Sequence, residues 1–346
     1  MARRPNPRRI SRRAAIAGSM ALAAGCSSNA LVPWGGRKVD SAVIDADPIL
    51  VLPADPVMLA YLDLQAAFRS SLSADVVSLV STFVPLGPES NFVPTRDAAR
   101  IYGGVYAMQG LDFAGIMQGN FDLAAIARSA DARAAAGGAS PLVKTRYADS
   151  DIYTISNVGF AALSPQTMLL GNETGIRRGL DRLRKRVITR GIPSWMFAEV
   201  GLPGTAFGLV GDFGAESVYD TDADGRFSKR PSAAAAAGTP ALDLSSGSFP
   251  FLQGAKLLRA RGTFSPPGAN IVGALTYETE ERANVAVGQL ANVGNVSPGM
   301  SILLSIGVGA SIANPTVARA GRDVAFIEPV DERLLRAVLQ QLMDRK

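Results

Sequence analysis

The stretch that decides the fold is LLRARGTFSPPGANIVGALTYETEERANVAVGQLANV, residues 257–293. It contains two strand-like runs, Leu257–Phe264 and Ile271–Tyr277, joined by a turn at Pro266-Pro267-Gly268. Thr279 then predicts the start of a helix over Glu280–Val293. A threonine oxygen accepts from the free N–H groups of a first helical turn, and the acids that follow suit a helix N-terminus. The stretch therefore predicts a β-hairpin followed by a capped helix.

The first half of the chain repeats this order. A hairpin is predicted at Ile101–Met108 and Asp112–Asn120, and Asp122 caps the helix behind it. A single strand precedes the hairpin in each half, at Val57–Leu64 and at Ala206–Asp212. We therefore predict an α+β fold with two similar halves of antiparallel strands and hairpins, and with helices packed on one face. The alternative is one irregular α+β domain whose local segments are alike by chance.

The first unit is predicted over residues 48–192 and the second over residues 193–346, with an irregular loop at 215–250. An apolar stripe predicts one long helix over Gln65–Val84. Asp331 is expected to cap the last helix. The remaining expected elements are strands at Ile152–Ser156, Phe160–Leu163, Thr167–Leu170, Ser301–Ile306 and Asp323–Ile327, and a helix at Glu173–Val187.

The first 26 residues predict export from the cytoplasm. Met1–Gly25 carries six arginines and no acid, and the apolar run Ala14–Gly25 is 12 residues long. A membrane-spanning helix needs about 20 apolar residues, so this segment is typical of a cleaved signal peptide. We assign residues 1–25 to the signal peptide and residues 26–47, which are polar and interrupted by proline and glycine, to a tether.

The end of this leader, Leu22-Ala23-Ala24-Gly25-Cys26, resembles the lipobox of bacterial lipoproteins. The resemblance implies that Cys26 is lipidated and becomes the N-terminus of the mature chain. Ordinary cleavage after Ala21-Leu22-Ala23 is the alternative and would leave a free thiol. Ser11-Arg12-Arg13 resembles a twin-arginine export motif, with the general export route as the alternative.

Residues behind the leader extend the resemblance. Many Gram-negative lipoproteins carry an aspartate after the lipidated cysteine for inner-membrane retention, and Ser27 at that position favours the outer membrane. Leu52-Pro53-Ala54-Asp55 before a strand, and Met168-Leu169-Leu170-Gly171 before a basic helix, resemble poorly characterised bacterial envelope lipoproteins. The resemblance covers most of the mature chain and supplies no catalytic residues.

Composition excludes several classes of function. The whole chain carries a net charge of +5, but removing residues 1–25 takes away six arginines and leaves 29 basic and 30 acidic residues. The mature chain is therefore nearly neutral, which argues against nucleic-acid binding. There is no histidine, and Cys26 is the sole cysteine. Ser-His-Asp catalysis, intrachain disulfides and Cys-rich zinc sites are thereby excluded.

One acidic loop is a candidate metal site. Asp220, Asp222 and Asp224 alternate before a glycine, as in the opening of a calcium loop, and Ser228 occupies the position of a water-mediated ligand. Pro231 stands where that motif requires a bidentate glutamate. The loop is therefore interpreted as solvated, with a weak calcium site as the alternative.

A basic cluster is the other candidate site. Its functional interpretation is contact with anionic lipid or glycan, and the favoured interpretation is a solvated helix face whose later cations suit the helix C-terminus. The cluster consists of Arg177, Arg178, Arg182, Arg184, Lys185, Arg186 and Arg190.

Together these features predict a membrane-anchored envelope lipoprotein that acts as a non-catalytic binding or structural module. No catalytic residue and no cofactor are expected. The expected partners are the membrane, through the lipid anchor, and an envelope protein or an anionic glycan or lipid. One alternative is a carrier or sensor of an apolar ligand, bound beneath Gln65–Val84. Another is a hydrolase that uses a pair of carboxylates.

Overall fold

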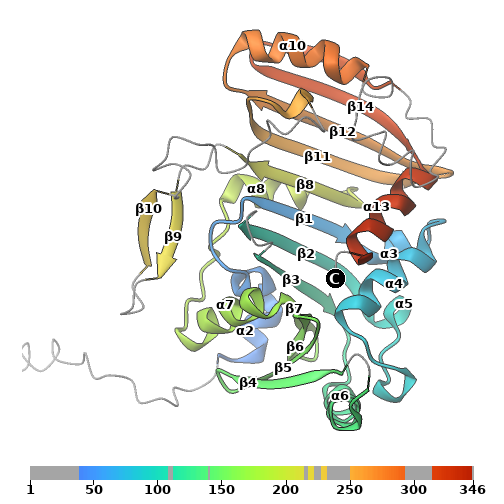
Figure 1. The fold of residues 1–346 in the computed structure, drawn as a ribbon, viewed down its shortest axis with the longest axis vertical. Helices are drawn as coiled ribbons and strands as arrows, with labels where there is room; N and C mark the ends of the chain where they lie inside the picture. The colour runs from blue at the N-terminus through green and yellow to red at the C-terminus, as the bar shows by residue number, and fades with distance from the viewer. Residues whose placement is uncertain are drawn as a thin grey trace, which may run out of the picture. The chain divides into compact units, whose positions relative to one another are not determined.

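The computed structural model describes residues 39–107, 112–138, 141–213, 217–221, 227–231, 250–292 and 314–344. Within these residues, twelve strands form one antiparallel sheet in the order β13-β14-β12-β11-β8-β1-β2-β3-β7-β6-β5-β4 (Figure 1). The predicted α+β class is confirmed. The sheet runs without interruption through both halves, and Val39–Lys346 form one compact unit.

The two halves of the sheet follow the same plan. Each begins with a central strand, continues with the two strands of a hairpin, and adds two later strands in reversed order. The first half contains β1 (Met58–Asp63), β2 (Ala98–Ala107), β3 (Asp112–Gly119), β7 (Thr167–Asn172) and β6 (Val158–Ser164), and then β5 (Ser150–Ile155) and β4 (Val143–Tyr147). The second contains β8 (Phe207–Asp212), β11 (Ala255–Ser265), β12 (Gly268–Tyr277), β14 (Asp323–Asp331) and β13 (Thr316–Ala320).

The halves meet where β1 pairs with β8. This pairing is antiparallel and runs from Met58 opposite Gly211 to Leu62 opposite Phe207. A separate hairpin, β9 (Ser217–Thr221) with β10 (Phe227–Pro231), lies within the segment that was expected to be irregular. The predicted strand Ser301–Ile306 lies outside the described residues.

Side-chain caps position several helices as the sequence predicts. Asp122 accepts from the Ala125 N–H at the start of α6, and Thr279 accepts from the Arg282 N–H at the start of α10. These contacts satisfy donors that have no partner inside the first helical turn. The helices and short 3-10 turns are α2 (Ser41–Ala46), η1 (Pro48–Val51), α3 (Leu64–Phe68), α4 (Ser73–Phe83), η2 (Pro88–Ser90), α5 (Pro94–Asp97), α6 (Leu123–Ala136), α7 (Glu173–Arg184), α8 (Ser194–Val200), η3 (Pro250–Leu252), α10 (Glu280–Ala291) and α13 (Glu332–Asp344).

The prediction of a single helix over Gln65–Val84 is wrong, because the chain forms α3 and α4 with a break between them. The Ser70 hydroxyl donates to the Ala67 carbonyl and accepts from the Leu72 N–H. These local bonds replace helical ones, which is the usual way that serine competes with a helix. The end of the predicted tether is also folded, since α2 buries Ile44, and Asp45 accepts hydrogen bonds from Ser164 and Thr167.

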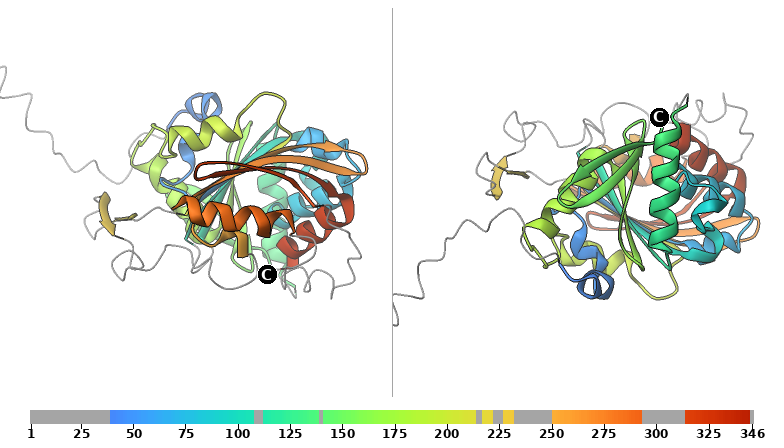
Figure 2. Two further views of the ribbon diagram at one scale, coloured as in Figure 1. Left: turned by 90° about the horizontal axis from the view of Figure 1, so that it is seen from above. Right: turned by 90° about the horizontal axis from the view of Figure 1, so that it is seen from below.

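Helices cover both faces of the sheet, whereas the sequence analysis placed them on one (Figure 2). Neighbouring strand residues point to opposite faces, and on β3 this places Ile116 in one core and Met117 in the other. The first core lies against α2, η1, α7 and α8. The second lies against α3, α4 and α6, with side chains of α13 packed on it. A third cluster lies under α10.

The second half of the sheet has one exposed face. On β12, Leu275 is 1% exposed and packs in the α10 cluster, whereas Val272 is 43% exposed. On β14, Val324 is fully buried and Ile327 is 54% exposed. Val272 and Ile327 are register partners on one face. The outward side chains of these strands, among the described residues, therefore meet solvent on the face that α7 and α8 cover in the first half.

Candidate functional site

The residues predicted for export and lipidation cannot be placed. All of them lie outside the described part of the chain: Ser11, Arg12, Arg13, Leu22, Ala23, Ala24, Gly25 and Cys26. None of the helices in the described ranges has the length and apolar character needed to span a membrane.

The predicted calcium loop is partly described. Asp220 and Ser228 are register partners across the hairpin of β9 and β10, and Asp222 and Asp224 lie outside the described residues. Among the residues that are described, no group of three or more acidic, histidine or cysteine side chains is arranged to hold a metal ion.

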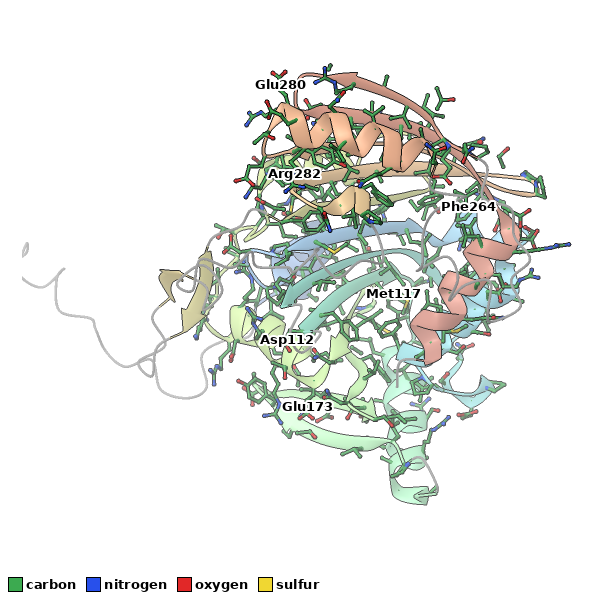
Figure 3. The ribbon with its side chains drawn as sticks, turned by 45° about the horizontal axis from the view of Figure 1, so that its top comes forward. Asp112, Met117, Glu173, Phe264, Glu280 and Arg282 are labelled. Carbon is green, nitrogen blue, oxygen red and sulfur yellow. The ribbon has the colours of Figure 1, made fainter. Side chains whose placement is uncertain are left out.

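The basic cluster on and after α7 contacts its own chain. Arg182 is only 5% exposed and donates to the carbonyls of Leu50 and Thr189. The outer arginines form ion pairs and stack on rings. Arg177 pairs with Glu173, Arg178 with Asp112, Arg184 with Asp181 and Arg190 with Asp47, and the rings are those of Tyr147, Tyr106 and Phe197 (Glu173 and Asp112 are labelled in Figure 3). The interpretation of this cluster as a uniformly solvated face is therefore corrected at Arg182, which is part of the core.

A pocket that the sequence analysis did not predict lies at the middle of the sheet. Its volume is about 310 Å³. One wall is formed by β1, β2 and the start of α3, and the other by the loop between α8 and β8. The lining residues are Tyr61, Asp63, Ala66, Arg100, Tyr102, Gly201, Leu202, Pro203, Gly204, Thr205 and Ala206.

Strand register brings the polar lining residues together. Tyr61 lies opposite Tyr102 and Asp63 lies opposite Arg100 in the antiparallel pair of β1 and β2. Because alternate residues of a strand share a face, all four belong to one face of the sheet. The rings of Tyr61 and Tyr102 are 5.0 Å apart between centroids and are tilted by 42°.

Glycine allows the turn in the loop that forms the second wall. Gly204 has φ of +80°, which side chains rarely tolerate. The N–H of Thr205 donates to the Leu202 carbonyl, and the N–H of Ala206 donates to the Gly262 carbonyl on β11. These bonds fix the loop against the neighbouring strand.

The polar groups of the pocket differ in whether other described residues form hydrogen bonds or ion pairs with them. Asp63 accepts from the Ala66 N–H at 2.9 Å and so caps α3. Burial, together with the nearby Asp63 charge, raises the pKa of Tyr61 above its ordinary value, although Arg100 acts in the opposite direction. Arg100 forms no ion pair or hydrogen bond, and the hydroxyl of Tyr102 forms no hydrogen bond, with any described residue.

This lining combines hydrogen-bond donors with the rings of two tyrosines. Arg100, Tyr61, Tyr102 and Thr205 can donate, and one carboxylate, Asp63, lines the pocket. Glycoside hydrolysis requires two carboxylates that flank the bond. On the opposite face, where the alternative hypothesis placed an apolar ligand, α4 packs Val76 and Val80 into the second core.

Comparison with known proteins gives no family. No family model matches the chain, and no curated protein matches it. The chain is similar to the solved structure of crystal form I of TP0453, with 13% identity and a TM-score of 0.47, over 85% of this chain and 97% of that one. Crystal form III of TP0453 has 12% identity and a TM-score of 0.45, over 85% of this chain and 98% of that one.

Proposed function

We propose that the chain is a lipid-anchored protein of a bacterial cell envelope and that its α+β domain is a non-catalytic binding module. The leader, which ends in the lipobox-like residues before Cys26, supports the anchor. Arg100 and the hydroxyl of Tyr102, which line the central pocket and have no hydrogen-bond or ion-pair partner among the described residues, support binding. The only carboxylate among the pocket-lining residues caps a helix, and the chain has no histidine, which disfavours catalysis there.

The anchor fits the start of the folded domain. Asp40 caps α2, which begins at Ser41, so residues 27–40 connect the lipidated cysteine to the first helix. Fully extended, a chain of about 14 residues spans at most about 50 Å. The domain would therefore stay close to the membrane surface. One acyl chain holds a protein only marginally, at about 0.8 kcal/mol per buried CH₂, so the proposal requires the two or three chains that bacterial lipoproteins carry.

Radiolabelled palmitate tests the anchor. Wild-type protein should incorporate the label, and Cys26→Ser should not, because serine lacks the thiol that is acylated. Ser28→Ala is the matched control and should be labelled as wild type. Equal labelling of the wild type and Cys26→Ser would overturn the proposed anchor.

Fractionation of the two membranes tests the location. The proposal places the protein in the outer membrane, because Ser27 stands where an aspartate retains many Gram-negative lipoproteins in the inner membrane. Ser27→Asp should move the protein from the outer to the inner membrane fraction, and Ser27→Ala should not. If wild type and Ser27→Asp share one fraction, the sorting argument fails and the anchor does not.

A further inference from the structure

We propose that the central pocket binds a singly charged oxyanion, a carboxylate or a phosphodiester, with Arg100 as its charged contact and the hydroxyls of Tyr61 and Tyr102 as further donors. This inference deepens the binding function proposed above and rests on it. The argument depends on the partners that these side chains lack, on the charge of the pocket and on its size.

Arg100 lines the pocket and forms no ion pair with any described residue. Its cross-strand neighbour is the carboxylate Asp63, yet no ion pair joins them within 4 Å, and one oxygen of Asp63 caps α3. Some arginines in the described part of the chain form ion pairs, for example Arg96 with Asp97 and Arg336 with Asp75, and others, such as Arg261, form none; Arg100 differs from Arg261 in lining the pocket. Arg100 is exposed. A guanidinium with its donors free is the side chain best suited to a carboxylate or phosphate.

Tyr102 adds a donor that its own chain does not use. The residue is only 6% exposed, and its ring contacts those of Tyr61 and Phe197. Its hydroxyl has no hydrogen-bond partner among the described residues and is not one of their fully buried unpaired atoms, so it is open to water at the pocket. An acceptor on a bound ligand would replace that water as the partner of the hydroxyl.

Tyr61 is held in the form that donates. A tyrosine with its ordinary pKa of about 10 keeps its proton at neutral pH, and burial and the charge of Asp63 raise the pKa of Tyr61 further. The same Asp63 charge disfavours a second negative charge on the ligand. The pocket therefore favours one negative charge over two.

The size of the pocket restricts the ligand further. A volume of about 310 Å³ is at the lower end of the range for ligand pockets. Two tyrosine rings form part of the wall, and aromatic rings suit a flat or apolar body beside the charged group. A small acid with one ring fits this description, and so does the head group of an anionic lipid. Both present the same chemistry to Arg100.

Isothermal titration of the mature lipidated protein in a neutral detergent tests the inference, with benzoate as the probe. Benzamide has the same shape without the charge and should bind at least about tenfold more weakly. Arg100→Gln should weaken benzoate binding by about tenfold or more. Tyr102→Phe, which keeps the ring, should weaken it by about three- to tenfold.

Arg261→Gln is the matched control and should leave benzoate binding unchanged. Arg261 is an exposed arginine on β11 that belongs to the same face of the sheet and does not line the pocket. Equal losses in Arg100→Gln and Arg261→Gln would show non-specific attraction and overturn the proposal. Equal affinities for benzoate and benzamide would overturn it as well.

Vesicle flotation distinguishes the two sources of the anion. The full chain with Cys26→Ser, which has no anchor, is mixed with phosphatidylglycerol vesicles. Retention that Arg100→Gln abolishes and Arg261→Gln preserves identifies a lipid head group, and specific benzoate binding without such retention identifies a free acid. Absence of both overturns the pocket proposal. Palmitate labelling is independent of these results, so the anchor and the pocket can fail separately.

Discussion

Replacing Arg182 with methionine should destabilise the fold far more than the same change at its neighbour Arg184. Arg182 lies on α7 with 5% of its surface exposed. Its Nε donates to the Leu50 carbonyl at 2.9 Å, and an Nη donates to the Thr189 carbonyl. The guanidinium therefore joins η1 and the loop after α7 to one helix. Methionine keeps the apolar stem of the side chain and removes both hydrogen bonds.

The magnitude follows from these two bonds. A hydrogen bond from a charged donor contributes about 1.5–3 kcal/mol, so two contribute about 3–6 kcal/mol. Methionine recovers part of this, because the buried charge carries a desolvation cost, and the same burial lowers the pKa of Arg182. We expect a net loss of about 2–4 kcal/mol. Arg184 pairs with Asp181 at the surface, where such a pair contributes about 0–1 kcal/mol.

Urea denaturation of the purified full chain at pH 7 measures the difference. Both variants should keep the wild-type slope, so that the midpoints report stability. Arg184→Met should remain within about 1 kcal/mol of wild type. If the two variants lose the same free energy of unfolding, Arg182 is not a structural residue, and the assignment of this arginine to the core is refuted.

Three further predictions concern stability. In urea denaturation, Leu275→Ala should lower the free energy of unfolding by about 2–5 kcal/mol and Val272→Ala by less than about 0.5 kcal/mol, because only Leu275 is buried. Equal losses would contradict the conclusion that this face of the sheet is exposed. Gly288→Ala should raise the thermal midpoint, corresponding to about 0.5–1 kcal/mol, since the added Cβ meets open space inside α10; a lower midpoint would contradict this. Although burial acts to raise the pKa of Asp97, hydrogen bonds from Arg96 and a backbone N–H outweigh it, and the pKa is lowered. This carboxylate therefore stabilises the fold above its unfolded pKa of about 3.9, and the stabilisation is lost as pH falls through the lower folded pKa. The difference in free energy of unfolding between wild type and Asp97→Asn should shrink below about pH 4. A difference that stays constant with pH would exclude the effect.

Local chemistry made much of the fold predictable. Asp122 and Thr279 each accept a hydrogen bond from an N–H three residues further along, so these caps depend on nearby sequence. The hairpins of β2 with β3 and of β11 with β12 likewise depend on the short turns that join their strands. The strands that were missed are β4 and β13 at the two edges of the large sheet, and β9 and β10 in the segment expected to be irregular. The side chains of β4 and β13 are mostly exposed, so no buried face imposes an alternating pattern on their sequence.

The pocket left no motif in the sequence. Its main polar residues come from two strands about 40 positions apart, and its other wall comes from a loop 100 residues further along. The available signal was Tyr61 and Asp63 inside an otherwise apolar strand. By itself that signal indicates a strand with one partly polar face, and it does not show which other residues of the chain lie beside that face.

The sequence by itself predicted most of the helices, strands and caps and an export leader, and it established the absence of histidine and of a second cysteine, because each of these depends on neighbouring residues or on composition. Only the tertiary structure decided that β1 pairs with β8, which joins the two halves into one sheet and leaves one face of the second half exposed. Backbone hydrogen bonds between strands are alike for nearly all side chains. Register is therefore set by the packing of the whole sheet, and it was register that placed Arg100 beside two tyrosines.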